Sequence, residues 1–334
     1  MPTENAAALT SSEVGYVWSG YMIDDMSIQF LNVFHEQVKS PAIQKHIQAA
    51  KTLAMQQNEQ RRKLLTNDGF PVPIGFSKEE SDPSAPSLFT EHFFYFYLMN
   101  ASRLGLHFYS EAISNSVRED VRTFCESCFR DATQLYMNLI REMMEGGLYI
   151  PHPSIPAPEQ AEFIQKESFL HGWFGDTRPL HSMEMANLYK SVEIISIIIA
   201  MCTAFGQTAE GQDTRTMMHR GRELVREHYH RFGELLEESD LPVPALRDAD
   251  VTASVTRCFS DRLMLCHTAG LFGALITHYG QALGTVMKHD LVKEYTMRIG
   301  EAGAFSHDLT QLLISHEWLE KTPGAVDRKA LLSR

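Results

Sequence analysis

The sequence predicts an all-α protein made of two tandem four-helix bundles. A short motif in the first third of the chain recurs about half a chain length later, and the residues around its two occurrences align with each other. Each copy also carries four long segments whose apolar residues recur at helical spacing. No run of period-two alternation is long enough to require a sheet. With 334 residues, the chain is long enough for two domains, each with its own core.

The internal repeat is visible in GFPVP at 69–73, which returns as DLPVP at 240–244. The copies align at an offset of 171 before this phrase and 170 after it, so one loop differs by a single residue. A repeat of roughly 150 residues is far longer than a solenoid unit, so each copy is expected to be a domain. Aligned pairs include Glu13 with Glu184, Phe34 with Phe205, Tyr109 with Tyr279, Asp120 with Asp290, and Leu148 with Trp318. The expected boundaries are 1–147 for the first bundle, 148–178 for an interdomain linker and 179–334 for the second bundle.

Four helices are predicted in each copy. Thr10 and Glu13 form the T-x-x-E pattern of a capping box, which marks the start of the first helix. Apolar residues from Val14 to Ile28 then follow helical spacing. The predicted helices span 11–38, 41–66, 88–117 and 119–146 in the first copy, and 181–206, 213–238, 259–287 and 290–316 in the second.

The loops between the helices decide how each bundle is connected. The first and second helices of a copy, and the third and fourth, are joined by only a few residues, so each pair must be antiparallel. About twenty residues join the second and third helices, enough to run back along a helix of about 39 Å. Pro71 and Pro73, like Pro242 and Pro244, end the second helix and hold this exit extended. Two hairpins linked by one long crossover form the ferritin-like topology.

Five stretches of the sequence together resemble one protein family. They are YMIDDM at 21–26, GFPVPIGF at 69–76, FLHGWFGDTRPL at 169–180, DLPVP at 240–244 and FSDRLMLCH at 259–267. The chain resembles, over nearly its whole length, the uncharacterised bacterial family called domain of unknown function 3231, which is found largely in spore-forming bacteria. The resemblance implies tandem ferritin-like bundles and a sporulation or dormancy setting, and it brings no established activity.

Composition and charge narrow the range of partners. Hydrophobic residues make up 44% and charged residues 22%, as in an ordinary soluble globular protein. The net charge of −12 argues against nucleic acid and against an anionic membrane surface as partners.

The segment 263–287 has no Asp, Glu, Lys or Arg, but His267 and His278 within it favour a buried core helix over a membrane span. The odd number of cysteines, five, and the lack of a visible secretory signal favour a cytoplasmic setting. The oligomeric state is left open, a homo-oligomer included.

The ferritin-like topology raises the hypothesis of a di-iron or di-manganese centre. Such a centre needs a Glu from each of two helices and an E-x-x-H motif from each of the other two. Only Glu227 and His230 have this spacing, and both are expected on the flank and far side of their helix. His228 faces the core, and His267 and His278 share a face of another helix, so these three could meet. Hydrogen-bonded histidines are the expected outcome, and no bound metal or other cofactor is predicted.

The first copy has charged residues where the second has mostly apolar ones. Arg61 lies toward the core face of its helix, near Gln57, and Asp24 and Asp25 lie on the inner half of theirs. Because a buried guanidinium needs a carboxylate partner, we expect an ion pair in the interior of the first bundle. The alternative is that Arg61 extends to solvent and Asp24 has no role. The equivalent residues in the second copy are His228 for Gln57, Phe232 for Arg61, Ile195 for Asp24 and Ser196 for Asp25.

Two further motifs allow a functional interpretation. Cys125 and Cys128 form a C-x-x-C motif in mid-helix, where packed or solvated thiols are expected, with redox or metal chemistry as the alternative. The linker carries HPSIPAP and the aromatic FLHGWFGDTRP. These stretches are expected to fix the linker in a domain interface, with a ligand-facing element as the alternative.

The sequence carries none of the common catalytic signatures. G-x-S-x-G, a Gly-rich phosphate loop and H-E-x-x-H are all absent. We therefore expect a non-enzymatic protein that acts by binding a protein or a small ligand. The alternative is a metal-binding protein or di-metal carboxylate oxidase of the ferritin-like group, and a thiol-based redox protein ranks third.

Overall fold

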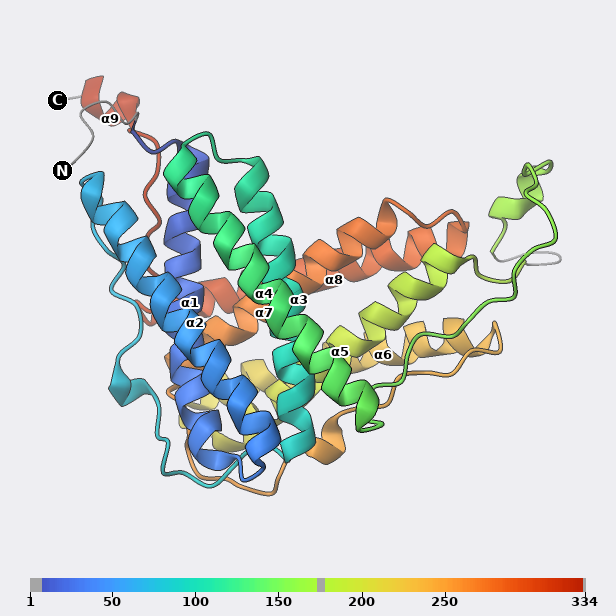
Figure 1. Ribbon diagram of the computed structural model, residues 1–334, viewed down its shortest axis with the longest axis horizontal. Helices are drawn as coiled ribbons and strands as arrows, with labels where there is room; N and C mark the ends of the chain where they lie inside the picture. Colours follow the sequence, from blue (N-terminus) through green and yellow to red (C-terminus); the bar gives the residue numbers. More distant parts are fainter. Residues whose placement is uncertain (1–7, 173–177, 333–334) are drawn as a thin grey trace. The chain divides into compact units, whose positions relative to one another are not determined.

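The chain folds into helices joined by loops over the residues that the structure describes, 8–172 and 178–332 (Figure 1). The structure is a computed structural model. Within these ranges there is no strand, and an isolated bridge joins Phe89 and Val251. The predicted all-α fold with four long helices in each half is confirmed. The helices are α1 (Ser11–Gln37), α2 (Pro41–Asn67), α3 (Glu91–Ser114), α4 (Glu119–Glu145), α5 (Ser182–Thr208), α6 (Gln212–Glu237), α7 (Asp261–Leu283), α8 (His289–Ser315) and the short α9 (Arg328–Leu332).

The third helix of each half is shorter than predicted, at 91–114 and 261–283 instead of 88–117 and 259–287. α3 begins late because Phe89 pairs with Val251 in the extended bridge. Both helices end early for a shared reason. The backbone N–H groups just beyond them, in the turns to α4 and α8, donate to a buried glutamate from the first helix of the same half.

The first helix of each half begins with a capping box. At the start of α1, the Thr10 side chain accepts from the Glu13 backbone N–H, and the Glu13 carboxylate accepts from the Thr10 N–H, as the sequence pattern predicts. At the start of α5, His181 takes the place of the threonine and pairs in the same way with Glu184. The helix start is therefore repeated even though the capping residue differs.

Long crossovers join the second and third helices of each half, over residues 68–90 and 238–260, whereas the other connections within a half are short. Each crossover contains a short 3₁₀ helix, Lys78–Glu80 in the first and Asp248–Asp250 in the second. These two turns occupy the same position of the repeat at an offset of 170. Each half therefore has two short connections and one long crossover, as predicted, and the repeat extends into the irregular segments.

Two compact units can be distinguished, and neither follows a continuous stretch of chain. The first unit comprises 1–84, 98–142 and 317–334, and the second comprises 85–97 and 143–316. The first turns of α3 therefore belong to the second unit, and the segment after α8 belongs to the first unit. Each unit contains chain from both copies of the repeat.

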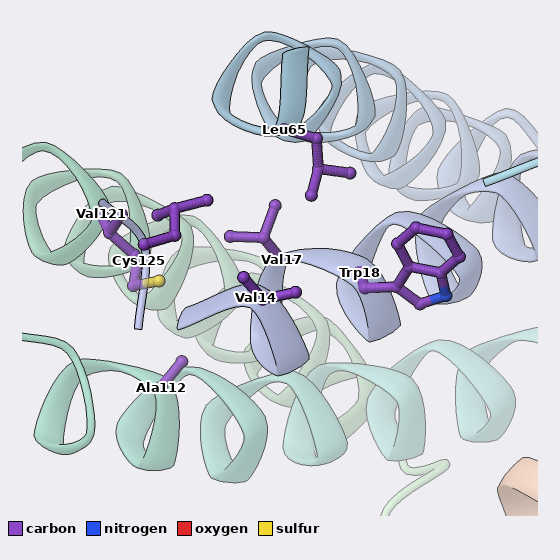
Figure 2. Close-up of a cluster of buried hydrophobic side chains, with 8 residues drawn as sticks. Val14, Val17, Trp18, Leu65, Ala112, Val121 and Cys125 are labelled. Carbon is purple, nitrogen blue, oxygen red and sulfur yellow. The ribbon is translucent and has the colours of Figure 1, made fainter. Parts of the chain in front are cut away.

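All four helices of the first unit meet in one apolar cluster (Figure 2). On α1, Val14, Val17 and Trp18 follow the i, i+3, i+4 spacing that places side chains on one face of a helix. The other labelled members are Leu65 from α2, Ala112 from α3, and Val121 and Cys125 from α4. The prediction of a four-helix core is met here by side chains from every helix.

Aromatic rings pack together in the interior of the second unit. Phe232 of α6, Tyr279 of α7 and Tyr295 of α8 are fully buried, with ring centroids 5.0–5.7 Å apart. Ser191 of α5 lies 3.1 Å from the Tyr295 hydroxyl, which brings the fourth helix to the same place. Aromatic pairs at this spacing stabilise a core beyond the area they bury.

One helix within the described ranges, α5, is long and apolar enough to cross a membrane, judged by length and composition alone. Its most apolar window has a mean hydropathy of 1.7, and 83% of that window is buried inside the protein. Burial of this kind is typical of the central helix of a globular bundle. The charge-free segment 263–287 forms α7 and the turn after it, and its two histidines are buried.

Candidate functional site

A buried ion pair lies among the helices of the first unit. Arg61 of α2 is 1% exposed, and its Nη1 donates to Oδ2 of Asp24 on α1. Asp24 is itself 5% exposed, so both charges are withdrawn from water. The alternative in which Arg61 extends to solvent is excluded by this burial.

Two aromatic residues and a glycine shape the space around the Arg61 guanidinium. Its Nη2 donates to the Tyr109 hydroxyl at 3.2 Å, and that hydroxyl donates to Oε1 of Gln57 at 2.7 Å. The Phe124 ring centroid lies 5.1 Å from Cζ of Arg61, within the range of a cation–π contact. A side chain at Gly20 would collide with the guanidinium, so a larger residue at this point of α1 would force Arg61 to shift.

The pair balances burial against charge attraction. Burial raises the pKa of the Asp24 carboxyl to about 7, although Arg61 acts to lower it. Burial lowers the pKa of the Arg61 guanidinium, but the Asp24 carboxylate reverses this and leaves it above its ordinary value. The centre of the first unit therefore holds a permanent cation that depends on one carboxylate.

Asp25, the other candidate partner of Arg61, lies in a different contact. Its Oδ2 accepts from the backbone N–H of Phe76 at 2.5 Å, in the crossover between α2 and α3. A side chain at Gly75 would collide with this carboxylate. Asp24 therefore faces the interior, and its neighbour Asp25 holds the crossover against α1.

In the second unit, His228 of α6 occupies the place that Gln57 occupies in the first. It is fully buried, with Nδ1 3.1 Å from the Tyr279 hydroxyl and Nε2 3.0 Å from Oε2 of Glu301. Arg298 of α8 donates to the same Glu301 oxygen at 2.7 Å and to Glu294 at 3.3 Å. This sequence of contacts leads from the fully buried Tyr279 to Glu301, whose side chain is 37% exposed.

The charges around His228 fix its protonation. Burial and the nearby Arg298 lower its pKa to about 4, although Glu301 acts in the opposite direction. The ring is therefore neutral at neutral pH and carries one N–H. Because the Glu301 carboxylate only accepts, that N–H is on Nε2, and the Tyr279 O–H donates to Nδ1.

Both units keep one hydrogen bond at the same repeat position. Tyr109 bonds Gln57, and its equivalent Tyr279 bonds His228, so the third helix reaches the second helix in the same way in each half. The arginine near this tyrosine comes from different helices, however: Arg61 is on α2 in the first half, and Arg298 is on α8 in the second. Each half therefore has an arginine and a carboxylate near this tyrosine, supplied by different helices.

The other histidines that were candidate metal ligands lie in separate networks. Nε2 of His278 is 3.0 Å from the Ser191 hydroxyl, and Nε2 of His267 is 2.9 Å from the Tyr97 hydroxyl. Glu227 and His230 are exposed on α6. Across the described ranges, no group of three or more His, Cys, Asp or Glu side chains is arranged to hold a metal ion. The donor set of a di-metal centre is therefore not assembled by these residues.

The C-x-x-C motif lies in the interior of the first unit. Cys125 is 4% and Cys128 is 1% exposed. Burial raises the pKa of both thiols, that of Cys128 to about 12, although Arg61 acts to lower it. All five cysteines of the chain fall within the described ranges, and none is in a disulfide. Thiolate chemistry is not favoured here, because a reactive thiol needs a low pKa and access to solvent.

The aromatic part of the linker falls partly on 173–177, outside the described residues. Among its described neighbours, Arg178 lies over the Phe169 ring at 4.0 Å and forms an ion pair with Glu184. Residues 154–168 are exposed along their whole length.

Two buried glutamates that the repeat alignment paired have a structural role that the sequence did not indicate. Glu13 accepts from the backbone N–H groups of Val117 and Arg118, at 2.9 and 2.7 Å. Glu184 accepts in the same way from Met287 and Lys288, at 3.0 and 3.1 Å. Each glutamate is 0% exposed and ties the start of its first helix to the turn between the third and fourth. Only the pairing of Glu13 with Glu184 across the repeat could have signalled this role.

Replacing Tyr279 with Phe is expected to lower the free energy of unfolding by about 1–3 kcal/mol, because Nδ1 of the buried His228 loses its donor. Urea melts of the wild type and the variant measure this difference. The equivalent variant Tyr109→Phe should cost at least as much, because it removes the acceptor of the buried Arg61 Nη2 as well as the donor to Gln57. An unchanged melt for Tyr279→Phe would contradict the assigned hydrogen bond.

The two repeated halves, the long crossovers and the hydrogen-bonded polar interiors define a duplicated helical-bundle protein. The chain belongs to the family described as protein of unknown function DUF3231, which matches residues 2–161 and again residues 168–331. The suspected family and the tandem arrangement are thus confirmed. A solved structure, that of a candidate spore coat protein from Bacillus halodurans C-125, is 19% identical with a TM-score of 0.41. The match covers 45% of this chain and 98% of that chain. No match was found among curated proteins.

Proposed function

We propose that this protein is non-enzymatic and acts by binding a protein or a small ligand. The observation that carries the proposal is the engagement of the interior polar groups with one another. Asp24 is neutralised by Arg61, and His228 uses both ring nitrogens, on Tyr279 and Glu301. Side chains that are already bonded in this way must give up those bonds before they can coordinate a metal or move a proton to a substrate.

Metal analysis tests the non-metal part of this proposal. Protein purified without added metal is expected to contain far less than one iron, manganese or zinc ion per chain. The His228→Ala variant serves as the control, since it removes the fully buried imidazole that contacts Tyr279 and Glu301. A stoichiometric metal content in the wild type that disappears in this variant would favour the metal-binding alternative instead.

Native mass spectrometry of the protein isolated from its own host tests the binding part. The expected spectrum contains the chain together with a defined partner protein or small molecule. A bare chain in every preparation, at any protein concentration, would contradict a binding role.

We also propose a cytoplasmic setting connected with sporulation or dormancy. Its support is the family resemblance in the sequence, together with cysteines that are buried or half-buried and not in disulfides. Quantitative mass spectrometry of growing cells and of spores of the host tests this setting. Equal amounts per cell in both states would argue against it.

A further inference from the structure

The crossover of the first unit contains a turn whose backbone N–H groups all bind carboxylates. The N–H groups of Ile74 and Gly75 donate to the two oxygens of Glu320, each at 2.7 Å. The next N–H, that of Phe76, donates to Asp25. Consecutive N–H groups that converge on an anion form a backbone nest, and a bidentate carboxylate is its natural occupant.

The conformation of this turn depends on glycine. Gly75 has a φ of +70°, in the left-handed region that side chains with a Cβ rarely adopt. The Asp25 carboxylate also occupies the space that a Cβ would need. Gly75 thus allows the backbone conformation that points the Ile74 and Gly75 N–H groups at Glu320, and Asp25 holds that conformation in place.

The carboxylate comes from the segment that follows α8. α8 ends at Ser315, and Glu317 has a φ of +58°, so the chain changes direction there. Residues 316–327 have no regular secondary structure, and from Glu317 onward the chain belongs to the first unit. Leu319, next to Glu320, is 49% exposed. Most of residues 321–332 are exposed, whereas Trp318 is half-buried. A segment that is mostly exposed relies strongly on its polar contacts to stay in place.

The arrangement is not a requirement of the bundle, since only one copy of the repeat has it. At the equivalent positions of the other copy, Ile150 replaces Glu320 and Ala245 replaces Gly75. That copy lacks both the carboxylate and the glycine. The pairing of Glu320 with this turn is therefore an added feature of the first unit.

We propose that residues 317–332 form a releasable strap, and that the Ile74–Gly75 turn is the carboxylate receptor that holds it through Glu320. Release of the strap frees two N–H groups next to Ile74, whose side chain is already 88% exposed. The strap is thus a conformational switch of the first unit, and it does not depend on the binding role proposed above.

Hydrogen exchange on the full chain tests the strap. In Glu320→Ala, the amides of Ile74 and Gly75 are expected to exchange about tenfold faster or more, because a charged acceptor shared by both N–H groups is lost. Mass spectrometry of a peptide covering 70–77 reads this change. Trypsin cleavage after Lys321, the residue next to Glu320, should become faster in the same variant.

Glu317→Gln is the matched control, since it removes a negative charge from the exposed part of the same segment. It should leave both the exchange and the cleavage rate unchanged. Glu320→Gln, which keeps one acceptor oxygen, should give an intermediate exchange rate. The proposal is overturned by unchanged exchange in Glu320→Ala, by an equal change in Glu317→Gln, or by global unfolding of Glu320→Ala. In the last case the segment would be part of the fold instead of a releasable strap.

Discussion

Replacing Arg61 with Phe is expected to lower the free energy of unfolding by about 3–5 kcal/mol, because Asp24 is left buried without its partner and must either ionise there or take up a proton. The double variant Arg61→Phe with Asp24→Ile should recover much of this loss. The second half of the chain already uses that apolar solution, with Ile195 and Phe232 at the equivalent positions. Urea melts of the single and double variants measure both effects.

The pH dependence of the single variant provides a second readout. Without Arg61, burial holds the pKa of Asp24 above its unfolded value, so the folded state prefers the protonated carboxyl. The penalty should therefore be small below the unfolded pKa, about 3.9, and should grow as pH rises through the folded pKa. Melts of the variant against wild type at pH 4 and pH 8 should show the larger loss at pH 8.

The companion variant Arg61→Phe with Asp25→Ser should not recover stability, because Asp25 bonds the Phe76 N–H instead of Arg61. Rescue by this change equal to the rescue by Asp24→Ile would contradict the assigned pair. A loss of under about 1 kcal/mol in the single variant, the value for an exposed ion pair, would contradict its burial.

Replacing Glu184 with Gln is expected to lower the free energy of unfolding by about 3 kcal/mol at neutral pH. This difference should disappear in acid. Glu184 is fully buried. Its carboxylate accepts hydrogen bonds from both Nη atoms of Arg178, at 2.7 and 2.9 Å, and from three backbone N–H groups. Burial alone would raise its pKa, but these hydrogen bonds reverse this and lower the pKa from 4.5 to about 2. The free energy of unfolding therefore depends on the ionised carboxylate.

The sign of the pH effect follows from the lowered pKa. The contribution of Glu184 is fully present above the unfolded pKa of about 4.5 and is lost as pH falls toward about 2. Urea melts of wild type and Glu184→Gln should thus converge between these two pH values. The matched variant Glu13→Gln should cost less, because the Glu13 carboxylate is bonded by Thr10 and by the backbone N–H groups of Val117 and Arg118, without the guanidinium that Glu184 has. A gap for Glu184→Gln that persists unchanged at pH 2 would contradict the role of the charge.

The helices and their connectivity could be predicted because both leave periodic signals in the sequence. The helical spacing of apolar residues predicted each helix, and each segment could be compared with its counterpart in the other copy. The lengths of the loops then indicated the long crossover between the second and third helices. The ends of the third helices could not be predicted, since they depend on Glu13 and Glu184 taking the backbone N–H groups of distant turns.

The candidate site could be predicted only in outline. Comparison of the two copies singled out Arg61 and Asp24, because each of these charged residues aligns with an apolar residue in the other copy. It could not choose Asp24 over Asp25, which lie about 100° apart on the helix, since the partner of Asp25 is in an irregular loop. Tyr279 and Glu301 were missed as partners of His228, because the direction of a hydroxyl or carboxylate leaves no periodic signal.

The assignment of the segment after α8 to the first unit has a consequence for how the protein is made. The ribosome delivers α1 to α4 by residue 145, but Glu320 emerges only about 175 residues later, roughly 9–35 s at the usual rates of synthesis. Throughout that interval the residues of the apolar cluster have been made, but the Glu320 carboxylate that binds the N–H groups of Ile74 and Gly75 has not. A first half that folds during this interval would present an open Ile74–Gly75 turn to other carboxylates before the protein's own glutamate is made.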